Sequence, residues 1–171
     1  MNLFICSTPF QIITSINIVV TKYQNEKVDI YILDHSPECY KYYCKLKNSK
    51  IFNEVYFLET RDAYVCKYKN KLNKILSYAK KFYNAMNYRW LEKKIPNKES
   101  FYNKIFIAYP DLPTQILYYF HKKNNVNIEL NFYEEGIFTY SAFKKKWSRI
   151  RKYYSKLLFG SFILDDCKKV L

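Results

Sequence analysis

A short acidic turn has the residue types that proton transfer needs. Residues 131–141 read Asn-Phe-Tyr-Glu-Glu-Gly-Ile-Phe-Thr-Tyr-Ser, and an apolar-rich run ends there in Glu134, Glu135 and Gly136. A strand that delivers a carboxylate to a tight turn can place a general base at a sheet edge. Gly136, one of only two glycines, permits positive φ and close approach of a ligand. A polar turn with two solvated carboxylates explains the same residues equally simply.

A second candidate turn lies at residues 7–11, Ser-Thr-Pro-Phe-Gln. Thr8 is placed to be a helix N-cap, Pro9 stands at the first helical position, and Gln11 can close a capping box. Such a turn can offer hydroxyls and amide N–H groups to an anionic or sugar ligand, with simple capping as the alternative. The chain has neither a Gly-x-Gly-x-x-Gly turn nor a Walker loop, so we expect neither hydride-transfer nor P-loop NTPase chemistry.

The histidines and cysteines give little support for a metal site. His35 and His121 are isolated in the sequence, and we expect a structural or surface role for each. The five cysteines have no Cys-x-x-Cys spacing, which disfavours zinc and suits reduced thiols in a cytoplasm. We expect Cys6, inside the first predicted strand, to be a core residue.

Hydrophobic periodicity predicts strands and helices in alternation. Strands are predicted at residues 2–6, 28–33, 53–58, 104–108 and 127–133, and helices at 9–23, 36–46, 61–94, 110–121 and 142–158. The alternation predicts an α/β fold, a Rossmann-like parallel sheet with helices on both faces. The first helix is expected to face the core with Ile12, Ile13, Ile16, Val19, Val20 and Tyr23.

The predicted topology brings several polar side chains to one edge. In an open parallel sheet, ligands bind at the carboxyl ends of the strands near the topological switch point. The residues that follow the first, fourth and fifth predicted strands are Ser7, Thr8, Tyr109, Asp111, Glu134 and Glu135. We expect a single domain over residues 1–158, followed by a tail, 159–171, in which another strand could begin a second domain.

The charge balance predicts an anionic partner. The chain of 171 residues has 29 Lys and Arg against 15 Asp and Glu, a formal net charge of +14. Basic stretches with interleaved aromatic residues, at 80–83 and 144–154, suit nucleic acid, an anionic membrane face or a simple solvated surface. No apolar run is long enough for a transmembrane helix, and no charged leader opens the chain. We therefore expect a cytoplasmic protein that can touch the inner face of the plasma membrane.

Two motifs together resemble a known family. The opening Asn-Leu-Phe-Ile-Cys-Ser-Thr-Pro-Phe-Gln resembles the start of bacterial glycosyltransferase family 52, the lipooligosaccharide sialyltransferases. Phe-Tyr-Glu-Glu-Gly-Ile-Phe-Thr-Tyr-Ser resembles the (Asp/Glu)-(Asp/Glu)-Gly motif of these and related bacterial sialyltransferases. Both motifs occur in the expected order and on the expected elements.

The resemblance implies a fold and a reaction. The family fold is GT-B, two Rossmann-like domains with the active site between them, and this chain would correspond to the amino-terminal, acceptor-side domain. The family transfers sialic acid from CMP-sialic acid to a sugar hydroxyl, usually of galactose, with inversion and without an obligatory metal or cofactor. Glu135 would be the general base, with Glu134 the less favoured candidate. Ser7, Thr8 and Gln11 would line the acceptor side, Gly136 would admit the ligand, and Thr139 or Tyr140 would help to hold a sugar.

The chain also departs from the family pattern. In the family, a His-Pro motif and a Ser-Ser/Thr motif in the second domain hold the CMP phosphate and the carboxylate, but neither His35 nor His121 precedes a proline. We therefore expect either a fragment or truncated form of a longer enzyme, whose second domain is missing here, or a partner chain such as a homodimer that completes the cleft. In both cases we expect little transfer by this domain alone. The alternative is a basic α/β module without catalysis that binds a membrane or nucleic acid, the latter disfavoured because no nucleic-acid-binding signature is present.

Overall fold

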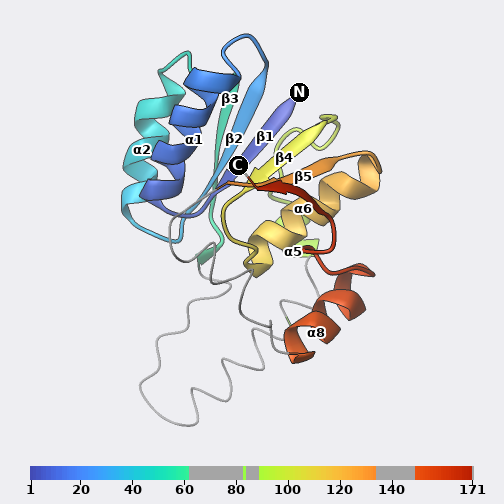
Figure 1. The fold of residues 1–171 in the computed structure, drawn as a ribbon. Coiled ribbons are helices and arrows are strands. Elements are labelled where there is room, and N and C mark those ends of the chain that lie inside the picture. Colours follow the sequence, from blue (N-terminus) through green and yellow to red (C-terminus); the bar gives the residue numbers. More distant parts are fainter. Residues whose placement is uncertain (62–82, 84–88, 134–148, 171) are drawn as a thin grey trace, which may run out of the picture.

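The fold is built around one parallel sheet (Figure 1). In a computed structural model of the chain, residues 1–61, 83, 89–133 and 149–170 are described, and the structural statements below concern these residues. The strands are β1 (Asn2–Cys6), β2 (Val28–Leu33), β3 (Glu54–Leu58), β4 (Lys104–Ile107), β5 (Glu129–Phe132) and β6 (Cys167–Val170). The α/β Rossmann-like fold predicted from the sequence is confirmed.

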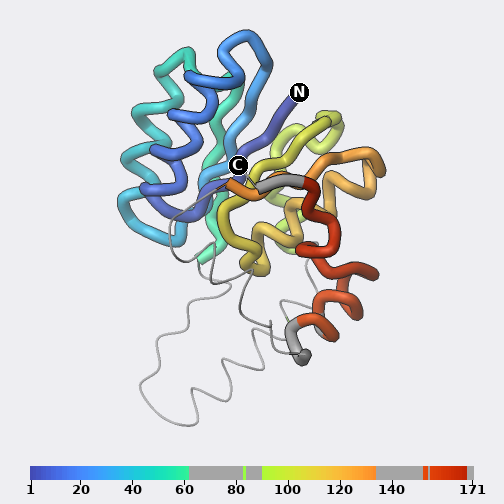
Figure 2. Tube along the Cα trace, in the orientation of Figure 1, coloured from blue at the N-terminus to red at the C-terminus, as the bar shows by residue number. Residues whose placement is uncertain are grey.

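The strand order is β3-β2-β1-β4-β5-β6, and every neighbouring pair is parallel. The chain first builds outward from β1 through β2 to β3, then returns to place β4 on the other side of β1. Figure 2 shows these two halves as blue to green and yellow to red. The order therefore reverses between β1 and β4, which is where open α/β sheets place their ligand sites.

Helices cover both faces of the sheet. All five residues of β1 are buried, and alternate side chains point to opposite faces. Phe4 and Cys6 pack with α1 (Pro9–Lys22) and α2 (Glu38–Lys47), whereas Leu3 and Ile5 pack with α5 (Arg89–Glu92) and α6 (Leu112–Asn124). The near-continuous apolar strands thus follow from burial on both sides.

The boundaries of several elements match the sequence-based predictions, but one helix face does not. Ile12 and Val19 of α1 are buried as predicted, whereas Ile13 and Val20 are 42% and 44% exposed. Each of these lies about 100° around the helix from its buried neighbour. Gln11 and Ser15 occupy the remaining buried positions. The periodicity rule assumed an entirely apolar buried face, and this assumption was wrong for α1.

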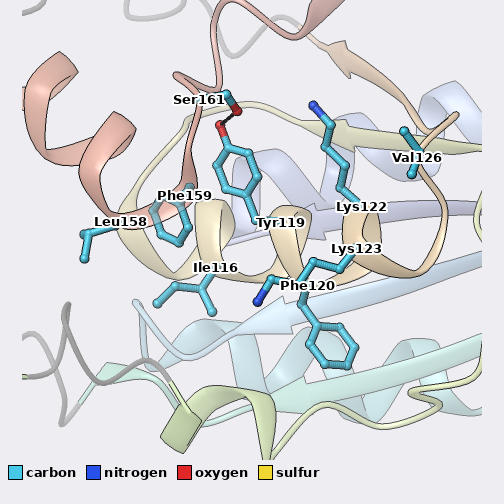
Figure 3. A pocket seen from close by; sticks show the side chains of 9 residues that line it. All are labelled: Ile116, Tyr119, Phe120, Lys122, Lys123, Val126, Leu158, Phe159 and Ser161. Atoms are coloured by element: carbon cyan, nitrogen blue, oxygen red, sulfur yellow. Dashed lines mark hydrogen bonds between the residues drawn. The ribbon is translucent and has the colours of Figure 1, made fainter.

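The C-terminal elements extend the sheet and cover α6. The strand expected in the tail lies at Cys167–Val170 and pairs with β5. α8 (Arg149–Phe159) packs on α6, where the Phe159 and Tyr119 rings stack with centroids 4.6 Å apart. A mainly apolar cavity of about 280 Å³ opens between the two helices, beside the hydrogen bond from Ser161 Oγ to Tyr119 Oη (Figure 3).

The buried carboxylate of Asp29 has two specific hydrogen-bond partners. Asp29 of β2 has no solvent exposure. Its Oδ2 accepts a hydrogen bond from Tyr102 Oη at 2.8 Å, and its Oδ1 accepts one from Asn53 Nδ2 at 2.9 Å. Burial raises the pKa of the Tyr102 phenol well above its usual range, so this hydroxyl stays a donor. Both carboxylate oxygens are therefore satisfied, as a buried charge requires.

His121 is buried as a neutral side chain against the Tyr102 ring, with the ring centroids 4.8 Å apart. It is 1% exposed, and burial lowers its pKa from 6.5 to about 4. Tyr31 Oη donates to the Pro96 carbonyl at 3.1 Å and lies 3.3 Å from His121 Nε2. Because a hydroxyl has one proton, Nε2–H donates to Tyr31 and Nδ1 holds the lone pair. Nδ1 has no partner in the part of the chain that the structure describes.

The Tyr102 hydroxyl should contribute measurably to stability. We expect Tyr102→Phe to lower the free energy of unfolding by about 1–3 kcal/mol, because it leaves a buried Asp29 oxygen without its donor. Tyr109→Phe removes the same atom from a side chain that is 38% exposed and should change stability by less than about 0.5 kcal/mol. Urea unfolding of the two variants makes the comparison, and equal midpoints would contradict the role assigned to Tyr102.

Acid should destabilise the fold through His121. The unfolded chain takes up a proton at His121 below about pH 6.5 and the folded chain only near pH 4, so stability falls as the pH decreases through this window. The expected loss is about 3 kcal/mol. His121→Phe should remove that part of the pH dependence, measured as urea stability at pH 7 and pH 4.5. An unchanged difference between the two pH values would show that His121 does not carry it.

Candidate functional site

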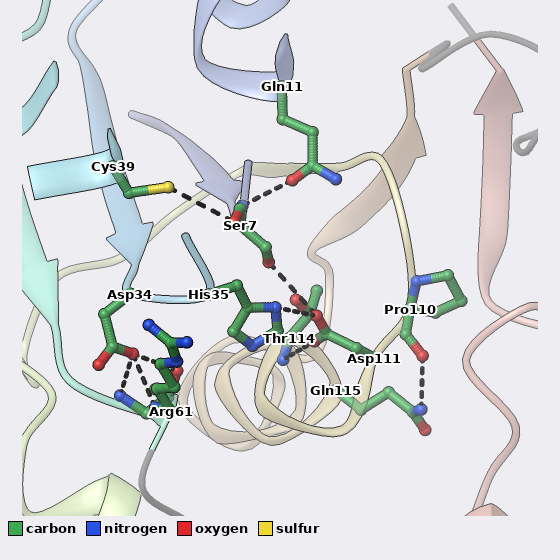
Figure 4. A network of polar contacts seen from close by, with 11 residues as sticks. Ser7, Gln11, Asp34, His35, Cys39, Arg61, Pro110, Asp111, Thr114 and Gln115 are labelled. Carbon is green, nitrogen blue, oxygen red and sulfur yellow. Dashed lines mark hydrogen bonds and ion pairs between the residues drawn. The ribbon is translucent and has the colours of Figure 1, made fainter. Parts of the chain in front are cut away.

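The strand ends at the switch point are joined by a side-chain contact. Ser7 follows β1 and Asp111 follows β4, 104 residues later in the sequence. Ser7 Oγ donates to Asp111 Oδ2 at 3.3 Å (Figure 4). The predicted meeting of the polar residues that follow β1 and β4 is therefore observed.

The turn after β1 is held by its own side chains. Thr8 is the N-cap of α1, and its Oγ1 accepts a hydrogen bond from Gln11 N at 3.3 Å. Gln11 Oε1 accepts one from Ser7 N at 2.6 Å, one residue earlier than the N-cap amide expected in a capping box. Ser7 and Gln11 are 5% and 4% exposed, whereas Thr8 is half-buried. The first two side chains therefore shape the turn from within.

Asp111 serves two structural elements at once. Its Oδ1 accepts a hydrogen bond from Thr114 N at 2.9 Å, which caps the N-terminus of α6. Its Oδ2 faces Ser7 Oγ and also lies 3.6 Å from His35 Nδ1. The side chains of Asp111 and His35 are 18% and 29% exposed. The carboxylate is thus fixed in position and still reachable from solvent.

His35 is the member of this site that sequence reasoning missed. It was assigned a structural or surface role because no metal ligand or base stood near it in the sequence. His35 follows β2, so the rule that gathers polar residues at carboxyl strand ends applies to it as well. The pairing of β2 with β1 brings His35 to the same edge as Ser7. We define the carboxyl-edge cluster as Ser7, His35 and Asp111.

Neighbouring loops hold the cluster in place. Asp34 Oδ1 accepts hydrogen bonds from Thr60 N at 2.5 Å, Thr60 Oγ1 at 3.0 Å and Arg61 N at 2.7 Å. The loop after β2, which includes His35, is thereby tied to the end of β3. On the other side of the cluster, Cys39 Sγ donates to the Ser7 carbonyl at 3.5 Å, and burial raises the pKa of this thiol. Cys39 is therefore a neutral packing residue rather than a nucleophile.

The N-terminus of α6 is supported from its far side. Gln115 Nε2 donates to the Pro110 carbonyl at 2.8 Å, and Gln115 Oε1 accepts from Ser155 Oγ of α8 at 3.1 Å. Gln115 is 7% exposed, so this amide is a buried bridge rather than a ligand group. It fixes the loop that carries Asp111.

The acidic motif begins directly after Tyr133, the residue that follows β5 and the last one described before a gap. Glu134, Glu135, Gly136, Thr139 and Tyr140 lie outside the described residues. Tyr133 is fully buried, its backbone N–H donates to the Ile107 carbonyl at 3.1 Å, and its hydroxyl lies 3.2 Å from Cys6 Sγ. Since Cys6 ends β1 and Ile107 ends β4, the chain leaves β5 at the edge that carries the cluster.

The described residues contain neither a cluster of metal ligands nor a membrane-spanning helix. Over residues 1–61, 83, 89–133 and 149–170, no three His, Cys, Asp or Glu side chains are grouped closely enough to hold a metal ion. In that same part of the chain, no helix combines the length and apolar character needed to cross a bilayer.

Comparison with known proteins identifies the family. Among curated proteins, no significant match to the chain was found. The family model described as alpha-2,8-polysialyltransferase matches residues 2–164, nearly the whole chain. This confirms a sialyltransferase-like glycosyltransferase, while assignment to glycosyltransferase family 52 in particular stays a prediction. The chain belongs to the alpha-2,8-polysialyltransferase family.

Proposed function

We propose that this chain forms the acceptor-side part of an enzyme that transfers sialic acid from CMP-sialic acid to a sugar hydroxyl. The observation that carries the proposal is the family match over residues 2–164. The matched range includes both the turn after β1 and the acidic turn, the two motifs whose residue types suit the chemistry. The parallel sheet with a switch point between β1 and β4 is a suitable frame, since ligands of such sheets bind at that edge.

The proposed base is Glu135, with Glu134 as the alternative. In the reaction, the acceptor hydroxyl gives its proton to the carboxylate while its oxygen attacks the anomeric carbon of the donor. The bond from that carbon to the CMP phosphate oxygen breaks, and the configuration inverts. A carboxylate beside the hydroxyl favours this step because it raises nucleophilicity as the donor carbon becomes oxocarbenium-like. Adjacent residues of an extended chain face opposite ways, so only one of the two should enter the cleft.

The roles proposed for the turn after β1 follow from burial. Thr8 is half-buried and can reach a ligand, whereas Ser7 and Gln11 are almost fully buried and hydrogen-bonded within the turn. We assign Thr8 to direct contact with the acceptor and the other two to holding the turn. Thr139 or Tyr140 would hold a sugar, and Gly136 would admit it to the backbone.

The acceptor that we propose is the terminal sialic acid of a growing glycan. The family description names alpha-2,8 transfer, which joins one sialic acid to another. Such a glycan carries a carboxylate on every residue, and a chain with a formal net charge of +14 attracts it over long range. A galactose-type hydroxyl is the alternative acceptor. A second domain or a second chain would complete the nucleotide site. An anionic membrane would be a further partner, attracted by the net positive charge of the chain.

A titration and an assay test this function. The purified chain should bind an alpha-2,8-linked trisialic acid in calorimetric titration, with CMP-sialic acid and a lactose-type acceptor titrated alongside. In the transfer reaction of the enzyme completed by its second domain or partner chain, Glu135→Gln should lower kcat by about a hundredfold or more, measured as sialylated product, because a general base contributes that much. Glu134→Gln is the matched control and should have a much smaller effect.

Two outcomes would contradict the proposal. Equal losses in the two glutamine variants would remove the assigned base. Binding of neither donor nor acceptor, together with oligonucleotide binding that weakens steeply with salt, would instead favour a basic binding module.

A further inference from the structure

We propose that His35 contacts the acceptor sugar, with Nε2 accepting a hydrogen bond from a hydroxyl and Asp111 acting as the residue that positions the ring. This inference rests on the proposed function and adds a residue that neither motif contains. It comes from the carboxyl-edge cluster, where Ser7 and His35 both turn toward the Asp111 carboxylate (Figure 4).

The first step is the position of the carboxylate. Asp111 Oδ1 is engaged by Thr114 N at 2.9 Å and Oδ2 by Ser7 Oγ at 3.3 Å. Because the backbone N–H and the serine come from different elements, the carboxylate has little freedom to rotate. The Asp111 carboxylate therefore has a fixed position and orientation at the topological switch point of the sheet.

The second step is the tautomer of His35. Nδ1 lies 3.6 Å from Asp111 Oδ2, beyond hydrogen-bond distance but close enough for the negative charge of the carboxylate to act on the ring. An ionised carboxylate only accepts, so it favours the tautomer with the proton on Nδ1. The lone pair then lies on Nε2, which has no hydrogen-bond partner within the described part of the chain. With the side chain 29% exposed, Nε2 is available to a ligand.

The third step is the class of ligand. An imidazole in this tautomer presents an acceptor, and its natural partner is a hydroxyl group. A phosphate or carboxylate placed at the same point would also face the negative charge of Asp111, which disfavours it. The cluster therefore suits a hydroxyl of the acceptor sugar better than the phosphate of the donor. Asp34 ties the loop of His35 to Thr60 and Arg61 and so fixes the position of the backbone that carries the ring.

Three substitutions test the proposal with the purified chain. Asn matches the Nδ1 position of histidine and Gln matches Nε2, so His35→Asn should lose the sugar contact and His35→Gln should keep it. Asp111→Asn retains the α6 cap, because Asn and Asp are equally good N-caps, but it no longer favours the productive tautomer. The readouts are the Kd for an alpha-2,8-linked trisialic acid, the Kd for CMP-sialic acid and the melting temperature.

We expect the trisialic acid to bind about tenfold more weakly to His35→Asn and to Asp111→Asn, the loss typical of one hydrogen bond. His35→Gln should stay within about threefold of the wild type, and all three variants should keep its melting temperature and the same CMP-sialic acid signal, which is expected to be small because a second domain or chain completes the nucleotide site. Equal weakening by His35→Asn and His35→Gln would overturn the proposal, as would unchanged binding in both. A wild-type chain that binds neither ligand would overturn the proposed function together with this inference, whereas the other two outcomes overturn the inference alone.

Discussion

The pairing of β1 with both β2 and β4 is the constraint on which the rest of the structure depends. β1 is buried along its whole length, and its two partners come from opposite halves of the chain. Because all three strands are parallel and adjacent, their carboxyl ends lie at one edge of the sheet. The residues that directly follow these strands are therefore close together. Ser7, His35 and Asp111 are such residues. A single topological fact, the reversal of strand order at β1, therefore creates the cluster and locates the candidate acceptor site.

Buried polar side chains as well as apolar ones hold this frame together. Asp29 is tied to Tyr102 and Asn53 beneath the sheet, and His121 is held neutral by burial beside Tyr31. At the carboxyl edge of the sheet, Asp34 and Gln115 bind loop backbone in the same manner. A buried polar group costs stability when it has no hydrogen-bond partner. The need to pair such groups therefore holds the loops around the site as well as the core. A rigid edge of this kind suits a reaction that depends on placing a hydroxyl beside a base.

The site was predicted unevenly from the sequence, and particular residues show why. The turn of Ser7 and Thr8 was predicted because a strand, a Pro at the first helical position and a cap are all local signals, and the structure confirms Thr8 as the N-cap. His35 was missed because its relevance depends on Asp111, which is distant in sequence and adjacent only through the sheet. Asp34 and Asp111 look alike in the sequence, each a polar residue after a strand, yet Asp34 is occupied by backbone amides and Asp111 remains partly open to a ligand. Ile13 and Val20 were placed in the core by periodicity, whereas buried positions of α1 are occupied by Gln11, which accepts a hydrogen bond from Ser7 N, and Ser15, which donates one to the Ile12 carbonyl.

The sequence by itself determined the class of fold, the start of α1 and the sialyltransferase-like character of the chain. The fold class and the helix start rest on local physics, alternating apolar runs of two lengths and a helix cap, whereas the sialyltransferase-like character rests on the resemblance of two short motifs to a known family. Tertiary structure alone decided the strand order, the partners of each carboxylate and the addition of His35 to the edge. The physical reason is that hydrogen bonding and charge act over a few ångströms, and only the folded sheet brings residues from separate strands within that distance.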